Sequence, residues 1–302
     1  MKIGYFADGP WSHKALEKIV GAPELEILYI VPRFDSQDPV LRQYAEKLDV
    51  PFLPLENVNS DTAVRKIKTL GADILVSMSF NQILKNDILN AAPMGFINCH
   101  AGKLPMYRGR NILNWALING ETSFGVTVHY VDEGIDTGDI ILQREAPIGP
   151  DDTYGDILER AITLCADVLF EALIQLATGV AQRIPQNTIH PVGMYCSMRR
   201  EGDEWINWSW PSVRIHNFVR GISLPGPCAR TRLGEDVIKI IRTALIPDAP
   251  SYIGIEGAVV GITRDGPIVK TGDSTIQILE YDFVRPGHNR NKKLTIGKRL
   301  GS

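Results

Sequence analysis

The chain of 302 residues contains only four cysteines, and they are scattered at positions 99, 165, 196 and 228. This number and spacing suit neither a disulfide framework nor a zinc cluster, so no metal site is expected. A charged leader with a long apolar stretch behind it is also missing, and no segment reaches membrane-spanning length. We therefore expect a cytoplasmic protein with reduced thiols and no membrane partner.

The glycine patterns of common nucleotide-binding loops are also missing. The first loop, residues 4–9, reads Gly-Tyr-Phe-Ala-Asp-Gly, not Gly-x-Gly-x-x-Gly. A dinucleotide needs those glycines for the tight turn and for the close approach of its pyrophosphate. A nicotinamide-dependent dehydrogenase is therefore disfavoured. No phosphate-binding loop that ends in Gly-Lys-Ser/Thr is present either.

Neither sign of charge dominates, because the chain has 32 Lys+Arg and 35 Asp+Glu, which give a net charge of -3. This balance does not forbid a nucleic-acid partner, but it gives no broad basic surface. Hydrophobic residues make up 44% and charged residues 22%, as in an ordinary soluble globular protein. A chain of this length forms one large or two modest domains.

Strand-like and helix-like segments alternate through the first half of the chain. Alternation of this kind implies a mostly parallel sheet that is covered on both faces. The predicted fold class is therefore α/β, with a doubly wound, mostly parallel Rossmann-like sheet. Strands are expected at 2–7, 25–31, 52–55, 74–78, 126–131 and 140–146, and helices at 15–20, 40–48, 63–70 and 153–177.

The last part of the chain follows a different pattern. A helix is expected from Ser212, and after a Pro-Gly-Pro break short alternating strands follow, separated by Gly, Pro and Asp turns. That pattern indicates a small antiparallel barrel or sandwich. We predict a Rossmann-like domain at 1–185, a linker and connecting helix at 186–225, and a small C-terminal β-barrel domain at 226–302.

Polar side chains follow one short strand signal, Gly95 to Ile97. Asn98 and His100 come next, and glycines and a proline then turn the chain. In an open α/β sheet, ligands bind at the carboxyl ends of the strands. Residues two apart on a strand share one face, so an amide and a titratable imidazole would lie together.

An acidic loop with several glycines, residues 132–139, follows the strand expected at 126–131. Asp136 is far enough after His100 for the chain to form a helix and a strand and return to the same sheet edge. Its carboxylate could orient the imidazole and raise its pKa, as in acyl transfer. On spacing alone, ordinary turns at both places remain an open alternative.

These residues, taken in order, resemble the signature of the folate-dependent formyltransferases. The signature is an Asn, a His two residues later, a Leu-Pro, a Gly and a distant Asp-x-Gly, here Asn98, His100, Leu104-Pro105, Gly109 and Asp136-Thr137-Gly138. The family includes methionyl-tRNA formyltransferase, glycinamide ribonucleotide transformylase and sugar N-formyltransferases. Residues 107–110 and 114–121 look most like the domain that formylates UDP-4-amino-4-deoxy-arabinose.

The resemblance implies an N-formyltransferase that moves a formyl group from N10-formyltetrahydrofolate to the primary amine of a nucleotide-linked amino sugar, in lipopolysaccharide or O-antigen biosynthesis. Asn98 and a protonated His100 would donate to the developing oxyanion, and Asp136 would keep His100 charged. The resemblance places folate at Phe80, Gln82, Ile83, Leu84, Asp132, Gly134 and Ile135. It places the acceptor at Tyr107, Arg108, Gly109, Arg110, Arg199 and Arg200.

Methionyl-tRNA formyltransferase is the main alternative. Relatives that bind tRNA commonly carry a basic loop after the second strand, but loop 32–39 here has one Arg and two Asp. We therefore expect a small acceptor and no nucleic acid, in a chain that could form a homodimer. Glycinamide ribonucleotide transformylase usually lacks a second domain. A binding protein on the same fold, or a hydrolase that releases formate, also remains open.

Overall fold

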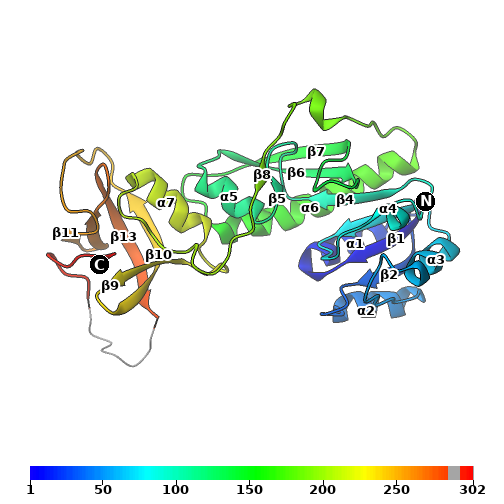
Figure 1. Cartoon of the computed structure of the whole chain (residues 1–302), viewed down its shortest axis with the longest axis horizontal. Coiled ribbons are helices and arrows are strands. Elements are labelled where there is room, and N and C mark those ends of the chain that lie inside the picture. The colour runs from blue at the N-terminus through cyan, green and yellow to red at the C-terminus, as the bar shows by residue number, and fades with distance from the viewer. Residues whose placement is uncertain (285–292, 302) are drawn as a thin grey trace. The chain divides into compact units, whose positions relative to one another are not determined.

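The computed structural model describes residues 1–284 and 293–301 (Figure 1). The chain forms two compact units. The first unit comprises residues 1–112, 124–146 and 159–196, and the second comprises residues 113–123, 147–158 and 197–302. The units therefore interleave along the chain, whereas the predicted domains follow one another, and the predicted boundary at residue 185 stays a prediction.

A six-stranded sheet forms the centre of the first unit (Figure 1). The first four strands across the sheet are parallel to one another, and the fifth runs antiparallel to the fourth. The segment predicted as a strand at 52–55 contributes only a bridge between Ile30 and Phe52. The strand order is β2 (Glu26–Pro32), β1 (Lys2–Ala7), β3 (Ile74–Met78), β4 (Phe96–His100), β6 (Ser123–Tyr130) and β7 (Ile140–Pro147).

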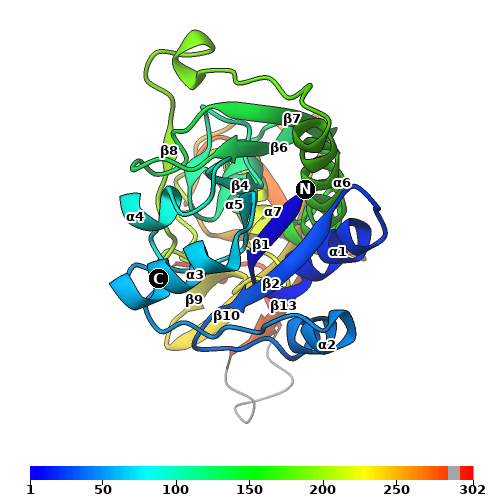
Figure 2. The same cartoon turned by 90° about the vertical axis from the view of Figure 1, so that its right-hand side faces the viewer.

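Helices cover both faces of this sheet, as Figure 2 shows: α1 (Gly9–Val20) and α6 (Tyr154–Ala177) lie on one side, and α3 (Asp61–Leu70) and α4 (Asn86–Leu89) on the other. An ion pair of 2.9 Å between Lys18 and Asp167 joins α1 to α6. All residues of β3 are buried, as expected for a strand between two helical layers. The remaining helix, α2 (Pro39–Leu48), follows β2 and begins at Asp38, which caps it.

The second unit is built on a five-stranded antiparallel sheet. Helix α7 (Ser212–Gly221) packs on β10. Trp208 lies in the core between them and donates from Nε1 to Thr231, so it is not available to stack on a ligand. The strand order is β11 (Val259–Thr263), β12 (Gly266–Lys270), β13 (Thr275–Phe283), β10 (Asp236–Leu245) and β9 (Ala229–Leu233), and α5 (Ile112–Ile118) belongs mostly to this unit.

The two sheets confirm the predicted fold class of a mostly parallel α/β sheet followed by a smaller antiparallel β domain. Part of the predicted linker is ordered on the first unit. Strand β5 (Arg108–Gly109) pairs with β8 (Tyr195–Cys196), and a 3₁₀ helix, η1 (Gln186–Thr188), precedes β8. Among the described residues, no helix is both long and apolar enough to span a membrane.

Candidate active site

Four polar side chains meet where β4 ends. The antiparallel register places Asn98 of β4 opposite His129 of β6. Nδ1 of His100 lies 3.7 Å from one carboxylate oxygen of Asp136, and Nε2 of His129 lies 3.6 Å from the other. The amide nitrogen of Asn98 lies 3.4 Å from Nε2 of His129. The structure therefore brings together the three predicted catalytic residues and adds a second histidine, and we call these four residues the catalytic cluster.

The backbone partners of the two imidazoles indicate which ring nitrogen carries hydrogen. Nε2 of His100 lies 2.8 Å from the carbonyl oxygen of Tyr107. A carbonyl can only accept, so Nε2 is a donor, and Nδ1, which faces Asp136, is the nitrogen that can gain a proton. Likewise, Nδ1 of His129 donates to the carbonyl of Tyr130 at 2.7 Å, which leaves its Nε2 to accept from Asn98 in the neutral ring.

Asp136 is held as an anion in a left-handed backbone conformation, with φ of 53°. Burial alone would raise the pKa of its carboxyl, but the neighbouring imidazoles of His129 and His100 and the backbone N–H of Gly109 together bring it well below its usual range. The Gly109 N–H lies 2.8 Å from the carboxylate. Asp136 is therefore ionised at neutral pH.

His100 differs from the expectation of a permanently charged ring. Burial is the largest influence on its pKa and lowers it, while Asp136 and the hydrogen bond to Tyr107 raise it and His129 lowers it further. The net pKa of His100 lies below its ordinary value. The predicted upward effect of Asp136 is present, but desolvation is larger, so the resting ring is neutral at pH 7.

His129 is the cluster residue that was not predicted. It is 2% exposed on β6, and Thr127 on the same strand is fully buried. Thr127 donates to the carbonyl of Gly102. Polar residues at alternate positions of a buried strand point to one face and require partners there, and that alternation was the available signal. The register that pairs His129 with Asn98 could not be read from the sequence.

The first predicted folate segment mostly stabilises its own loop. Phe80 and Leu84 pack against the apolar core of the first unit. The side chain of Gln82 accepts from the N–H of Val58 and donates to the carbonyl of Leu55, so it is already satisfied. Ile83, by contrast, is 83% exposed. Of these four side chains, Ile83 is the one most accessible to a ligand.

The second predicted folate segment borders a cavity of about 640 Å³. Asp132, Gly134 and Val131 line it, whereas the exposed Ile135 and the four residues of the catalytic cluster do not. Asp132 accepts hydrogen bonds within its own loop, from the N–H of Gly134 and the hydroxyl of Thr137. A hydrogen bond from Asn86 to Glu133 joins this loop to the segment after β3.

The predicted acceptor residues of the first unit are not a free binding surface. Tyr107 and Arg108 are both less than a tenth exposed. Arg108 donates from two nitrogens to the side-chain oxygen of Gln186 and from the third to the carbonyl of Val192. Gly109 has φ of 97°, and a Cβ there would lie 2.5 Å from the carbonyl oxygen of Cys196. Gly109 is therefore required by the close approach of β8.

Arg110, Arg199 and Arg200 have different surroundings. Arg110 is exposed, and its backbone N–H donates to Cys196. Arg199, in the second unit, donates to the carbonyl of Asp203 and lies 5.6 Å from the ring of Trp115. Burial lowers the pKa of Arg199, and the nearby acidic residues oppose this. Arg200 is exposed, so Arg110 and Arg200 are accessible to a partner.

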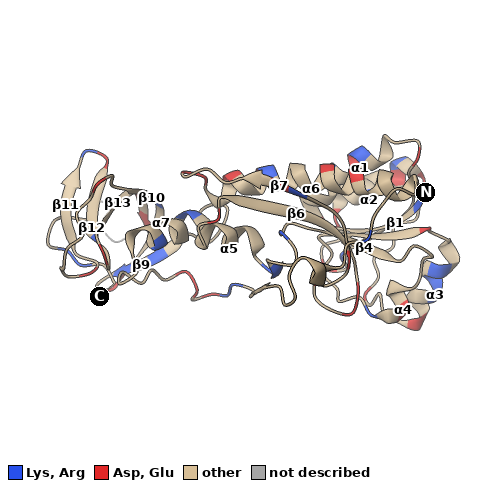
Figure 3. Cartoon of the chain, turned by 90° about the horizontal axis from the view of Figure 1, so that it is seen from above, with Lys and Arg blue, Asp and Glu red and all other residues tan. Residues whose placement is uncertain are grey.

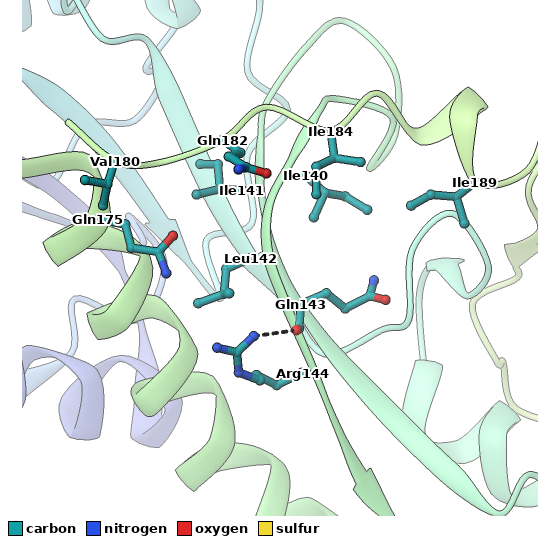
Figure 4. Close-up of a pocket in the computed structure, with 10 residues that line it drawn as sticks. All are labelled: Ile140, Ile141, Leu142, Gln143, Arg144, Gln175, Val180, Gln182, Ile184 and Ile189. Atoms are coloured by element: carbon teal, nitrogen blue, oxygen red, sulfur yellow. Dashed lines mark hydrogen bonds between the residues drawn. The ribbon is translucent and has the colours of Figure 1, made fainter.

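A second cavity, of about 530 Å³, lies along the edge strand β7 (Figure 4). It is lined by residues 140–144 of β7, by Gln175 of α6, and by Val180, Gln182, Ile184 and Ile189 of the segment that follows. No predicted site residue lines it. The catalytic cluster does not line it either, so this groove is separate from the candidate active site.

Known proteins match both parts of the chain. Residues 32–173 match the family Formyl transferase, and residues 199–286 match Formyl transferase, C-terminal domain. The methionyl-tRNA formyltransferase of Ruminiclostridium cellulolyticum is 32% identical over 270 residues, which cover 87% of this chain and 85% of the relative. That of Desulforamulus reducens is 32% identical over 291 residues, which cover 94% and 90%.

Solved structures share the fold at lower identity. The N-formyltransferase from Helicobacter canadensis, in complex with folinic acid and dTDP-3-aminofucose, has a TM-score of 0.68 and 20% identity, and covers 92% of this chain and 99% of its own. At that identity the likeness concerns the fold alone. Methionyl-tRNA formyltransferases, by contrast, are among the relatives that are at least 30% identical over most of both chains.

These findings overturn the predicted acceptor. The nucleotide-sugar substrate, the absence of a nucleic-acid partner and the setting in lipopolysaccharide or O-antigen biosynthesis were wrong. The motifs behind that prediction have structural roles: Tyr107 and Arg108 are buried, and Asn114 is buried and donates to the carbonyl of Gly221. Residues used for packing carry little information about the acceptor. The two family matches and the long alignments establish that this chain belongs to the formyl transferase family.

Proposed function

We propose that this protein is a methionyl-tRNA formyltransferase, which transfers a formyl group from N10-formyltetrahydrofolate to the amino group of methionine on its tRNA. The observation that carries the proposal is the identity of 30–35% to methionyl-tRNA formyltransferases over 81% or more of this chain. The catalytic cluster supports it, because its groups suit the transfer of a formyl group to an amine.

The acidic loop that carries Asp136 borders a cavity of small-molecule size, although no residue of the catalytic cluster lines that cavity. Its volume of about 640 Å³ is within the range of small-molecule sites. The lining residues Pro93 and Val131 are apolar, and residues 132–134 also line the cavity with backbone groups that can form hydrogen bonds. When bound, N10-formyltetrahydrofolate supplies an electrophilic formyl carbon. Asp132, Gly134 and the exposed Ile83 are the residues through which we expect this chain to hold it.

The catalytic cluster would handle the proton and the developing charge. As an attacking amine bonds to the formyl carbon it must lose a proton, and Nδ1 of the neutral His100, beside the ionised Asp136, accepts it. His100 is then a cation beside Asp136, and it gives the proton to the nitrogen of the donor that leaves when the bond between that nitrogen and the formyl carbon breaks. That cation, with the second N–H of the Asn98 amide, stabilises the oxygen that gains negative charge. His129 orients the Asn98 amide by accepting its first N–H.

The charge of loop 32–39, which favoured a small acceptor in the sequence, has a local structural cause. Arg33 donates to the carbonyl of Ser79, and Asp38 caps α2 while it pairs with His13. These charges stabilise the first unit, so their sign says little about tRNA. In the second unit, Figure 3 marks Lys and Arg on β9 and α7, where Arg232 and Arg214 stack on Trp205 and Trp210. Arginine and aromatic side chains together suit a nucleic-acid partner.

The test is a direct assay with the purified chain. We expect N10-formyltetrahydrofolate and methionyl-tRNA to give formylmethionyl-tRNA, with a KM for tRNA that rises steeply with salt because phosphate contacts release counterions. Free methionine is the matched acceptor without phosphates. A second arm omits the acceptor and measures released formate. Formate release without transfer, or transfer only to an amino sugar, would reject the proposal.

A further inference from the structure

A buried glutamine outside both family matches contacts the backbone of the acidic loop 132–139, which we call the catalytic loop because it carries Asp136. Gln186 is 3% exposed and lies in η1, in the segment predicted as a linker. Its side-chain nitrogen lies 2.8 Å from the carbonyl oxygens of both Asp136 and Gly138. The same side-chain oxygen accepts from Arg108 at 3.0 and 2.7 Å. One side chain thus joins the catalytic loop to Arg108.

The direction of this amide is imposed by Arg108. A guanidinium has five N–H donors and no acceptor, so the oxygen of Gln186 must face it. The amide nitrogen of Gln186 then has to face the two carbonyls of the catalytic loop. None of the described Asp or Glu residues forms an ion pair with Arg108 (residues 1–284 and 293–301). The buried guanidinium is instead satisfied by an amide and by the carbonyl of Val192.

Asp136 needs this support because its backbone is in a conformation that non-glycine residues rarely adopt, with φ of 53°. Such a conformation is energetically unfavourable and persists only where neighbouring contacts determine it. Two contacts do so here: the N–H of Gly109 binds the carboxylate, and Gln186 binds the backbone carbonyl. Arg108, which orients Gln186, directly precedes Gly109 in β5, so the two contacts to Asp136 depend on neighbouring residues.

We propose that Gln186, oriented by Arg108, is a positioning residue that sets the place of the Asp136 carboxylate relative to His100. The inference rests on the proposed function, since it concerns the same reaction. Gln186 does not contact the reacting groups; it acts through the backbone of Asp136. It would explain why a segment between the two family matches, residues 174–198, is packed into the candidate active site.

The discriminating variant is Gln186→Glu. A glutamate keeps the shape and pairs with Arg108, so the fold and the melting temperature should be retained. It cannot donate, however, and it places a charged oxygen against the carbonyls of Asp136 and Gly138. We expect kcat to fall by about tenfold to a hundredfold, since small displacements of catalytic groups have effects of this size, with both KM values within about threefold.

Gln182→Glu is the matched control, because it makes the same change at an exposed position of the same segment. We expect it to behave as wild type. Gln186→Met is the second variant, because it also loses donation but adds no charge. If Gln186→Met loses turnover while Gln186→Glu keeps it, the role is to satisfy Arg108, and the positioning role is rejected.

A measurement independent of activity separates this inference from the proposed function. The amide proton of Gly109 donates to Asp136 at 2.8 Å, so its NMR shift reports where the carboxylate lies. We expect that signal to move in Gln186→Glu and not in Gln182→Glu. A wild type inactive on methionyl-tRNA rejects the function and leaves this readout intact. An active wild type, with unchanged kcat and Gly109 signal in Gln186→Glu, overturns the inference.

Discussion

Three histidine–aspartate contacts occur in the first unit, one of His13 with Asp38 and two of Asp136 with His100 and His129, and the pairs His13–Asp38 and His100–Asp136 have different surroundings. His13 and Asp38 are 2.8 Å apart, closer than His100 and Asp136 at 3.7 Å. The carboxyl group of Asp38 and that of Asp136 both have a pKa below the usual range. Neither a short distance nor a lowered carboxyl pKa therefore identifies a catalytic pair. The partners of each carboxylate have to be compared.

Both oxygens of the Asp38 carboxylate already accept hydrogen bonds from within the first unit. Its two oxygens accept from the backbone N–H groups of Gly9, Val40 and Leu41 as well as from His13. It is a helix cap, and its charge stabilises α2. Asp136 accepts from the N–H of Gly109 and faces two imidazoles at 3.6 and 3.7 Å. Asp136 therefore lies between two buried imidazoles, whereas both oxygens of Asp38 are occupied by the helix cap, Gly9 and His13.

The largest expected effect is on turnover. We expect His100→Asn to lower kcat by at least about a hundredfold, the scale for lost acid–base and oxyanion groups, while the protein stays folded. Asn98→Ala and Asp136→Ala should behave alike. His13→Asn should leave kcat within about threefold, because His13 touches none of the cluster residues. Steady-state formyl transfer beside thermal melting is the measurement. Equal losses in the two histidine variants would remove the distinction between the pairs.

The second effect is on the free energy of unfolding, and here the larger change is expected at the His13–Asp38 pair. Asp38→Ala removes the N-cap of α2 and should lower the free energy of unfolding by about 1–2 kcal/mol. Turnover at a temperature well below melting should stay near wild type. Urea unfolding of Asp38→Ala and Asp38→Asn measures this. An Asp38 variant of wild-type stability would show that the four hydrogen bonds do not matter.

The sequence predicted one of these pairs and missed the other for a physical reason. Asn98, His100 and Asp136 form an ordered motif in the sequence, and the loop after β6 brings the Asp136 carboxylate close to His100. The pairing of Asp38 with His13 joins residues that are distant in sequence, and no motif links them. His129 and Gln186 are likewise recruited by register and by packing, so neither carried a motif.

The acceptor was mispredicted for a related reason. Charges in loop 32–39 were interpreted as a surface, yet Arg33 and Asp38 are used within the first unit. The strands and helices were predicted well because each depends on its own apolar periodicity. A substrate depends on which side chains remain free after packing. Composition and motif order do not contain that information.

The smallest expected effect is a change of folding stability with pH, and it depends on the lowered pKa of His100. Burial lowers the pKa of His100 in the folded protein, whereas the unfolded chain has the ordinary value of about 6.5. As pH falls below that value, the unfolded state binds more protons than the folded state, so wild type loses stability on acidification. The slope from one such group is at most about 1.4 kcal/mol per pH unit.

His100→Asn lacks this titrating group, so the stability of wild type relative to His100→Asn should decrease between pH 7 and pH 5. Urea unfolding of both proteins at the two pH values measures the difference. A gap that stays constant, or that moves in favour of wild type at low pH, would mean that His100 is not held neutral by burial.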